Sequence, residues 1–132
     1  MDNTYKLLLS YILPKEISDS FDLVDVNEVV SPVGEPVLTL KLEEKAITPD
    51  NRTDLEPNGF YPTQYITDFP IRERKVILQV RRRRWKDAHG KSVSKDWKLV
   101  AKGTRISVEF AAFLKESLGY DPDNSQESAK TL

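Results

Sequence analysis

A stretch of alternating apolar and polar residues that runs directly into four consecutive arginines constrains the fold of this chain more than any other feature. Within Lys75–Trp85, Val76, Leu78 and Val80 fall on one face of an expected strand, and Arg81–Arg84 follow at once. The apolar face of such a strand needs burial against a core. Four guanidinium groups are costly to bury. We therefore expect a strand whose first half lies in a core and whose second half projects into water.

The composition excludes several ways of stabilising or anchoring the chain. With 132 residues the chain fits one domain that can bury its own core. It has no cysteine and a single histidine, His89, which excludes disulfides and zinc sites built on thiolates or imidazoles. No apolar run is long enough for a membrane span, and the N-terminus lacks the pattern of a signal peptide. We expect a cytoplasmic protein with no metal and no cofactor.

The net charge of −1 conceals a strong division of charge along the sequence. The segment 72–105 holds thirteen basic and three acidic residues, a net charge of +10, whereas the rest of the chain carries −11. Such asymmetry points to a polyanionic partner. We expect all thirteen basic residues to gather on one ribbon-like projection whose root is buried. They are Arg72, Arg74, Lys75, Arg81, Arg82, Arg83, Arg84, Lys86, Lys91, Lys95, Lys98, Lys102 and Arg105.

Apolar periodicity and turn residues predict the remaining elements. A short helix at Tyr5–Ile12 ends before Pro14, and a further helical turn precedes Phe21. The predicted strands are Phe21–Val30, Val37–Glu43 and Tyr65–Ile71, the first two forming an antiparallel hairpin, with Ala46–Thr63 as a loop. Ser107 is the expected N-cap of a helix through Leu118 that packs against the sheet, and Gly119 is its stop.

These elements predict an α+β fold of antiparallel strands with a protruding basic β-hairpin, flanked by an N-terminal and a C-terminal helix. We expect a single domain over residues 1–118, with the basic hairpin unit at about 65–105. Residues 119–132 are expected to form a disordered tail, since Asp121–Leu132 is polar.

A register follows for the basic hairpin if its turn is Lys86–Lys91, with Gly90 in a left-handed conformation, and its return strand is Val93–Ala101. The register places apolar residues together on one face and pairs Arg81 with an acid on the other. The expected pairs are Val76–Ala101, Leu78–Leu99, Val80–Trp97, Ile77–Val100, Arg81–Asp96 and Trp85–Ser92.

We expect this hairpin to bind DNA without catalysing a reaction. Strand side chains alternate, so the end of the hairpin is positive on both faces and can contact phosphates on either side of a groove. One or two of the arginines are expected to contact guanine. The candidate nucleic-acid-binding residues are Arg81, Arg82, Arg83, Arg84, Trp85, Lys86, Lys91, Lys95, Lys98, Lys102 and Arg105.

Several alternatives stay open. A run of charges is often only a solvated edge strand. Trp85 suits stacking on a base or packing on a neighbouring loop equally well, whereas Trp97 suits core packing. The Asp87–His89 pair lacks a nucleophile at a convincing spacing. The competing functions are a protein-interaction adaptor and a small metal-dependent nuclease; masking of the basic hairpin by the chain's own acidic part is a third possibility.

The residues Ile66–Ile71 and Val76–Trp85 resemble the N-terminal region of bacterial insertion-sequence transposases that carry a DDE catalytic domain. That family has a zinc-ribbon-like unit with an "R-D-x-P" turn, a strand ending in "V-R-R-x-R/F", a second cysteine knuckle and a basic segment. The resemblance covers about Tyr65–Leu118 and places Lys102–Arg105 at the basic segment. The whole chain also resembles the separately encoded N-terminal region of some of these elements.

This sequence departs from the family at both cysteine knuckles. They would fall within Pro49–Gly59 and Lys86–Lys91, and neither segment contains cysteine. The resemblance therefore implies a metal-free ribbon, stabilised by Trp97, Leu99 and their neighbours in place of zinc. It further implies binding to transposon ends and a separately encoded DDE catalytic chain as partner, because no such domain fits after Leu118.

Overall fold

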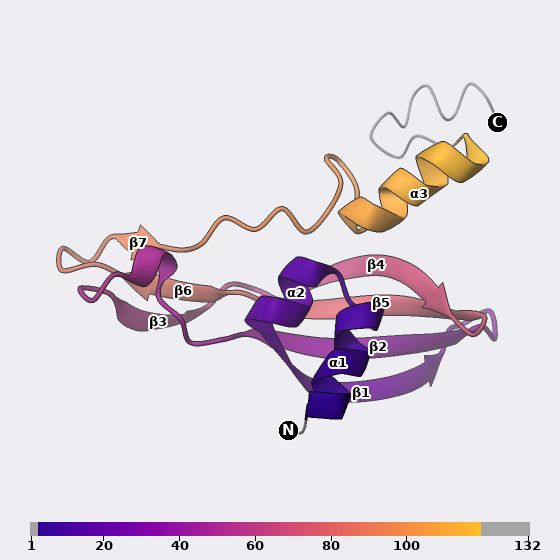
Figure 1. Ribbon diagram of the computed structural model, residues 1–132, viewed down its shortest axis with the longest axis horizontal. Coiled ribbons are helices and arrows are strands. Elements are labelled where there is room, and N and C mark those ends of the chain that lie inside the picture. Colours follow the sequence, from indigo (N-terminus) through magenta and orange to yellow (C-terminus); the bar gives the residue numbers. More distant parts are fainter. Residues whose placement is uncertain (1–2, 120–132) are drawn as a thin grey trace.

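The computed structural model describes residues 3–119, which form an α+β fold with helices at both ends and two sheets between them (Figure 1). Asp121–Leu132, the predicted tail, lies outside the described residues. The helices and strands are α1 (Asn3–Ile12), α2 (Lys15–Ser20), β1 (Phe21–Val30), β2 (Pro36–Glu44), the 3₁₀ turn η1 (Pro49–Asn51), β3 (Glu56–Phe60), β4 (Gln64–Ile71), β5 (Arg74–Arg81), β6 (Arg83–Lys86), β7 (Ser92–Val93) and α3 (Val108–Leu118).

The larger sheet has four strands in the order β1-β2-β5-β4. The β1–β2 hairpin predicted from the sequence is confirmed, and β4 and β5 form a second antiparallel pair. The two hairpins join through β2 and β5, which run parallel, with Leu40 opposite Leu78 and Leu42 opposite Val80. This central pairing connects residues almost forty positions apart, and no local pattern in the sequence signals it.

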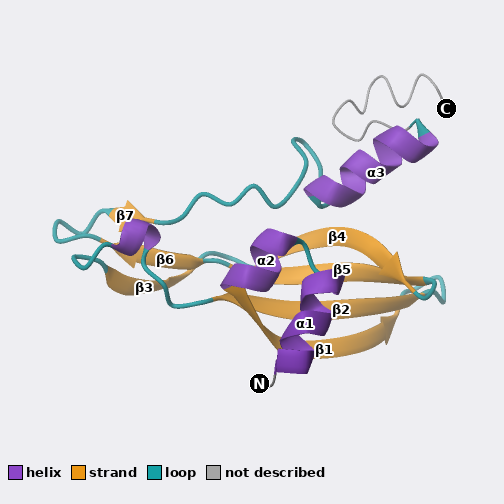
Figure 2. Cartoon of the chain, in the orientation of Figure 1, coloured by secondary structure: helices purple, strands orange, loops and turns teal. Residues whose placement is uncertain are grey.

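The N-terminal helices cover one face of this sheet (Figures 1 and 2). The core beneath them contains Leu13 and Ile17 from the helical region together with Leu42, Leu78 and Val80 from the two central strands, all of them buried. Pro14 separates the two helices, since the chain leaves α1 there and starts α2 at the next residue. The predicted helical turn before Phe21 is thus confirmed as α2.

The smaller sheet has three antiparallel strands in the order β3-β6-β7 and extends beyond one end of the larger sheet (Figure 2). β3 lies within the segment that was predicted to be loop throughout. Pro57 and Gly59 hid this strand from the sequence pattern, because both residues are rare inside strands. They are tolerated here because β3 is at the edge of its sheet.

The prediction of one continuous strand over Lys75–Trp85 is wrong. The strand is interrupted at Arg82, where the chain leaves the larger sheet as β5 and enters the smaller one as β6. The carbonyl of Arg82 accepts a hydrogen bond of 2.9 Å from the Tyr61 N–H, so the backbone stays paired at the crossing.

The predicted hairpin register is also wrong. Only Ser92 and Val93 pair with the arginine-bearing strand, and Trp85 lies opposite Val93, one residue from the expected partner. The remainder of the proposed return strand forms no ladder with β5, because β2 and β4 already occupy both edges of that strand. Leu99 is nevertheless buried in the core and Trp97 packs against it, so the anchoring role of this segment is confirmed without the pairing.

Helix α3 has the ends that the sequence predicts. The Ser107 hydroxyl accepts a hydrogen bond from the Phe110 N–H, and Gly119 adopts a left-handed conformation with φ of 70°. Gly90 in the turn after β6 is likewise left-handed, with φ of 79°. None of the helices among residues 3–119 is long and apolar enough to cross a membrane.

A buried carboxylate ties α3 to the larger sheet. Asp68 on β4 is 4% exposed, and its Oδ1 accepts a hydrogen bond of 2.7 Å from the hydroxyl of Ser107, the N-cap of α3. Burial raises the pKa of Asp68 above its ordinary value, although the hydrogen bonds from Ser107 and from the Phe69 N–H partly oppose the rise.

We expect Asp68→Asn to raise the free energy of unfolding at neutral pH. A raised pKa means that the unfolded state ionises first as pH increases, so wild-type stability falls from about the ordinary value of 3.8 upward until the folded pKa is passed. Asparagine keeps an acceptor for Ser107 and does not ionise, so the advantage of the variant should grow over this range. Urea denaturation of both proteins at several pH values measures the difference in their free energy of unfolding. If the variant's advantage over wild type is smaller at pH 7 than at pH 4, the assignment is contradicted.

Candidate nucleic-acid interface

The two sheets meet where the acidic end of β2 contacts the first of the four arginines. Glu44 is 5% exposed; its Oε1 accepts a hydrogen bond of 2.9 Å from the Arg83 N–H, and its backbone carbonyl accepts one of 2.7 Å from Arg83 Nε. The neighbouring Glu43 forms a salt bridge of 2.8 Å with Arg81. Glu44 and Arg83 therefore fix the backbone where the chain crosses between the sheets, and Glu43 holds the side chain of Arg81, which precedes the crossing.

Two aromatic residues organise the four arginine side chains. The guanidinium groups of Arg81 and Arg83 lie over the Phe60 ring, 4.0 and 4.8 Å from its centroid. Those of Arg82 and Arg84 lie over the Tyr61 ring at 4.9 and 5.8 Å. Odd-numbered and even-numbered arginines thus gather on different rings, as the alternation of strand side chains requires.

The stacking leaves the four arginines partly exposed rather than buried. Neither Arg82 nor Arg84 forms a salt bridge with a carboxylate among residues 3–119; Arg84 Nε instead donates 3.1 Å to the carbonyl of Asn58. Their charge is therefore available to an outside anion. Arg81 is partly neutralised by Glu43, and Lys86 lies 3.8 Å from the exposed Glu56.

Trp85 is buried, with 4% of its surface exposed. It lies opposite Pro57 on β3 and Val93 on β7, in the centre of the smaller sheet. This position favours packing over stacking on a base, so the proposed contact between Trp85 and nucleic acid is not supported. The Trp85 indole thus lies at the centre of the smaller sheet.

The turn that follows is organised by Asp87. Its Oδ1 accepts hydrogen bonds of 2.9 Å from the N–H groups of both His89 and Lys91. These bonds hold the pKa of Asp87 below its ordinary value, and the bond from Lys91 has the larger effect. His89 is exposed. The carboxylate is thus committed to the turn, which presents His89 and Lys91 to solvent.

The expectation that all thirteen basic residues share one projection is wrong. Arg72, Arg74 and Lys75 lie at the β4–β5 turn, and a strand of the length of β5 separates them by about 20 Å from the arginine run. Arg74 also pairs with Glu28 at 2.9 Å. The cause is the parallel pairing of β2 with β5, which makes β5 a central strand of the larger sheet rather than one arm of a free hairpin.

The other predicted site residues divide into two groups. Lys95 stays near the smaller sheet, with its ammonium 4.3 Å from the centroid of the Trp97 ring. Lys98, Lys102 and Arg105 are exposed along the segment that returns toward α3. We use the name arginine arm for the smaller sheet with its attached cations: Arg81, Arg82, Arg83, Arg84, Lys86, Lys91 and Lys95.

Four contributors to the site were missed from the sequence. Phe60 and Tyr61 were assigned to a loop, Glu43 was the last residue of a predicted strand, and Glu44 lay just beyond that strand. A usable signal was present, since an aromatic pair next to a glycine is unusual in a purely solvated loop and indicates a structured contact.

Within residues 3–119, no group of three or more histidine, cysteine, aspartate or glutamate residues is placed to hold a metal ion. The nuclease hypothesis therefore has no candidate metal site in this part of the chain. Comparison with models of known protein families, with curated proteins and with solved structures gave no match for this chain.

We expect Glu44→Ala to destabilise the protein more than Glu43→Ala. Loss of the Glu44 carboxylate leaves the partly buried Arg83 N–H without its acceptor, at a cost of about 1–3 kcal/mol. Loss of the half-exposed Glu43–Arg81 salt bridge should cost less than about 1 kcal/mol. Urea denaturation of the two variants makes the comparison, and equal small losses would show that the junction does not depend on Glu44.

Proposed function

We propose that this protein binds DNA through the arginine arm, as the accessory N-terminal region of an insertion-sequence transposase, and that it carries out no catalysis itself. The observation that carries the proposal is the placement of four consecutive arginines where the chain passes from the larger sheet into the projecting smaller one, held by two aromatic rings. Within residues 3–119, neither Arg82 nor Arg84 has a carboxylate partner. The transposase assignment rests on the sequence resemblance alone.

The dimensions of the arm support a groove as its target. β6 and β7 form a two-stranded ribbon around the turn that holds Lys91, and the major groove of B-DNA, about 12 Å wide, admits such a ribbon. An arm that enters edge-on would bring the turn with Lys91 into the groove. The arginines stacked on Phe60 would then lie near one phosphate strand, and those stacked on Tyr61 near the other.

Stacking lowers the cost of ordering the arginines on binding. A free arginine loses about 2 kcal/mol of rotamer entropy when it is fixed, whereas a guanidinium already held over a ring loses less. Such preorganised donors suit bidentate phosphate contacts. Neutralising about six phosphates would give a slope of roughly −5 for log affinity against log salt.

The remaining parts of the proposal follow from the same assignment. A separately encoded DDE chain would supply catalysis, and the complex would act on transposon ends in the cytoplasm. The protein-interaction adaptor remains the second candidate, and the surface described in the next subsection favours it as an additional role rather than as a replacement.

We expect Arg82→Ala/Arg84→Ala to weaken DNA binding and to flatten the salt slope by about 2, since each phosphate contact contributes about 1. The matched control is Lys41→Ala/Lys75→Ala, which removes the same charge from exposed positions on the larger sheet. Fluorescence anisotropy with a duplex of the element's terminal inverted repeat, and with a scrambled duplex of equal length, measures both quantities.

An unchanged slope in the arginine variant would contradict the proposed interface. Equal losses in both variants would show a general charge effect. Equal affinity of wild type for the two duplexes would support DNA binding but not recognition of the transposon end.

A further inference from the structure

Helix α3 is attached to the rest of the molecule mainly through its first half. Phe110 and Phe113 pack on Phe69 of β4, with ring centroids 4.9 and 5.5 Å apart, and Ala111 is the helix residue that is buried. Phe113 is nonetheless 45% exposed and Leu118 69% exposed. The prediction that α3 packs against the sheet is thus confirmed only for this first half, and much of its apolar surface has no cover among the described residues.

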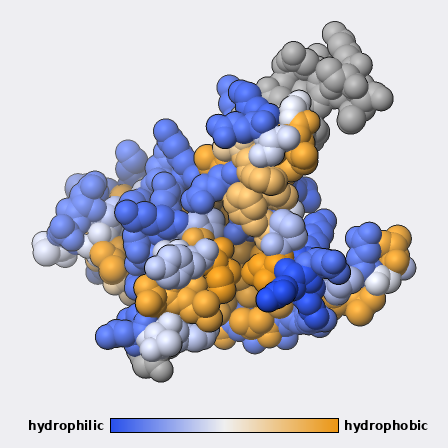
Figure 3. All heavy atoms as spheres, turned by 45° about the vertical axis from the view of Figure 1, so that its right-hand side comes forward, coloured by the Kyte–Doolittle hydropathy of each residue, from blue (hydrophilic) through white to orange (hydrophobic). Residues whose placement is uncertain are grey.

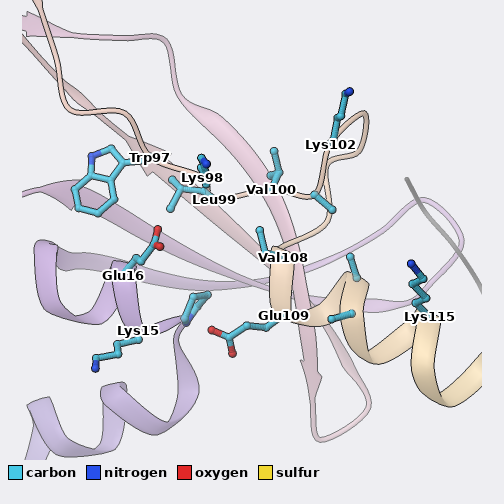
Figure 4. A pocket seen from close by; sticks show the side chains of 14 residues that line it. Lys15, Glu16, Trp97, Lys98, Leu99, Val100, Lys102, Val108, Glu109 and Lys115 are labelled. Atoms are coloured by element: carbon cyan, nitrogen blue, oxygen red, sulfur yellow. The ribbon is translucent and has the colours of Figure 1, made fainter. Parts of the chain in front are cut away.

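A groove of about 1100 Å³ runs between α3, the start of α2 and the segment 97–102 (Figure 4). Its apolar lining comes from all three parts: Pro14, Trp97, Leu99, Val100, Ala101, Val108, Ala111 and Ala112. Apolar surface also gathers in the middle of this face and along α3 in Figure 3, bordered by hydrophilic side chains. Single exposed apolar residues are ordinary on a protein surface, whereas here apolar residues from three separate segments line one groove.

The charges around the groove are unevenly placed. Lys102 and Lys115 stand at one end of it in Figure 4, and Lys98 lies above its middle, while Glu16 and Glu109 lie toward α2 with Lys15. None of the four lysines forms a salt bridge with a carboxylate in the described part of the chain. Lys98, Lys102 and Lys115 therefore line the groove from its middle to one end with positive charge that no salt bridge within residues 3–119 neutralises.

We infer that this groove docks an amphipathic helix of a partner protein, apolar on the face that enters the groove and acidic along the flank that meets Lys98, Lys102 and Lys115. The apolar lining suits side chains spaced at i, i+3, i+4 and i+7, and the lysines select acidic flanks and orient the helix. This surface is separate from the arginine arm, and the inference does not depend on DNA binding.

Nucleic acid is a poorer occupant of the groove than a helix. Phosphate and ribose would gain little from the alanine, valine and leucine side chains of the lining, and Glu16 and Glu109 would repel phosphates at the other end. Val108, which lines the groove, is 46% exposed, so part of the apolar lining is accessible to a bound helix.

The test uses the full chain and a labelled synthetic helix about four turns long, with leucines at i, i+3, i+4 and i+7 and glutamates at the flanks. The control peptide has lysine in place of every glutamate. Fluorescence anisotropy should show saturable binding of the acidic peptide and about tenfold weaker binding of the lysine peptide. Failure of the acidic peptide to bind up to about 1 mM, or equal binding of both, overturns the inference.

Two variants locate the binding. Ala112→Glu adds a bulky acid at an exposed position that lines the groove, and it should weaken the acidic peptide about tenfold. Lys102→Glu/Lys115→Glu should reverse the preference so that the lysine peptide binds better. Circular dichroism confirms that each variant is folded, and unchanged peptide binding in both folded variants overturns the inference.

A competition experiment separates the groove from the DNA-binding surface. We expect duplex DNA not to displace the acidic peptide, and Ala112→Glu to keep most of the DNA affinity that Arg82→Ala/Arg84→Ala loses. Displacement of the peptide by DNA, together with loss of DNA binding in the Ala112→Glu variant, would assign the groove to the DNA surface and overturn the inference. Loss of DNA binding in the arginine variant bears only on the proposed function.

Discussion

The hydrogen bonds between Glu44 and Arg83 determine how the two sheets are joined. A strand that leaves one sheet and enters another must change its partners within a residue or two without leaving backbone groups unpaired. The carboxylate of Glu44 accepts the Arg83 N–H at that point, the carbonyl of Glu44 accepts Arg83 Nε, and the Tyr61 N–H bonds to Arg82. Because these contacts are made at the end of β2, the direction of the arginine arm is set by the core of the larger sheet. The charged part of the molecule is thus positioned by its apolar part.

The sequence predicted the elements better than their pairing. Alternation correctly placed the strand at Phe21–Val30, the hairpin that it forms and the strand at Tyr65–Ile71, and capping residues placed the ends of α3. These signals are local, so they can be detected without knowledge of the fold. The parallel pairing of β2 with β5 is not local, and it invalidated the proposed hairpin because it removed a free edge from the strand that the hairpin needed.

The candidate site shows the same division between local and distant information. Four consecutive arginines are evident in the sequence, and their alternation between two faces follows from strand geometry. Which aromatic ring each of them contacts does not follow, because Phe60 and Tyr61 come from a strand that Pro57 and Gly59 disguise. The net charge of the segment was likewise a poor guide to shape, since the length of β5 carries Arg72 and Lys75 to the far end of the sheet.

The parallel contact between β2 and β5 also gives the fold an order of assembly. The β1–β2 hairpin can form early, yet its inner strand has no second neighbour until the chain has been synthesised beyond Val80. Closing so long a loop slows folding relative to a chain of hairpins alone. During translation, one edge of β2 would remain unpaired for this interval, and the arginine run would be the segment synthesised as the interval ends. The larger sheet then closes when β5 pairs with β2, and the smaller sheet forms directly afterwards from the residues that follow β5.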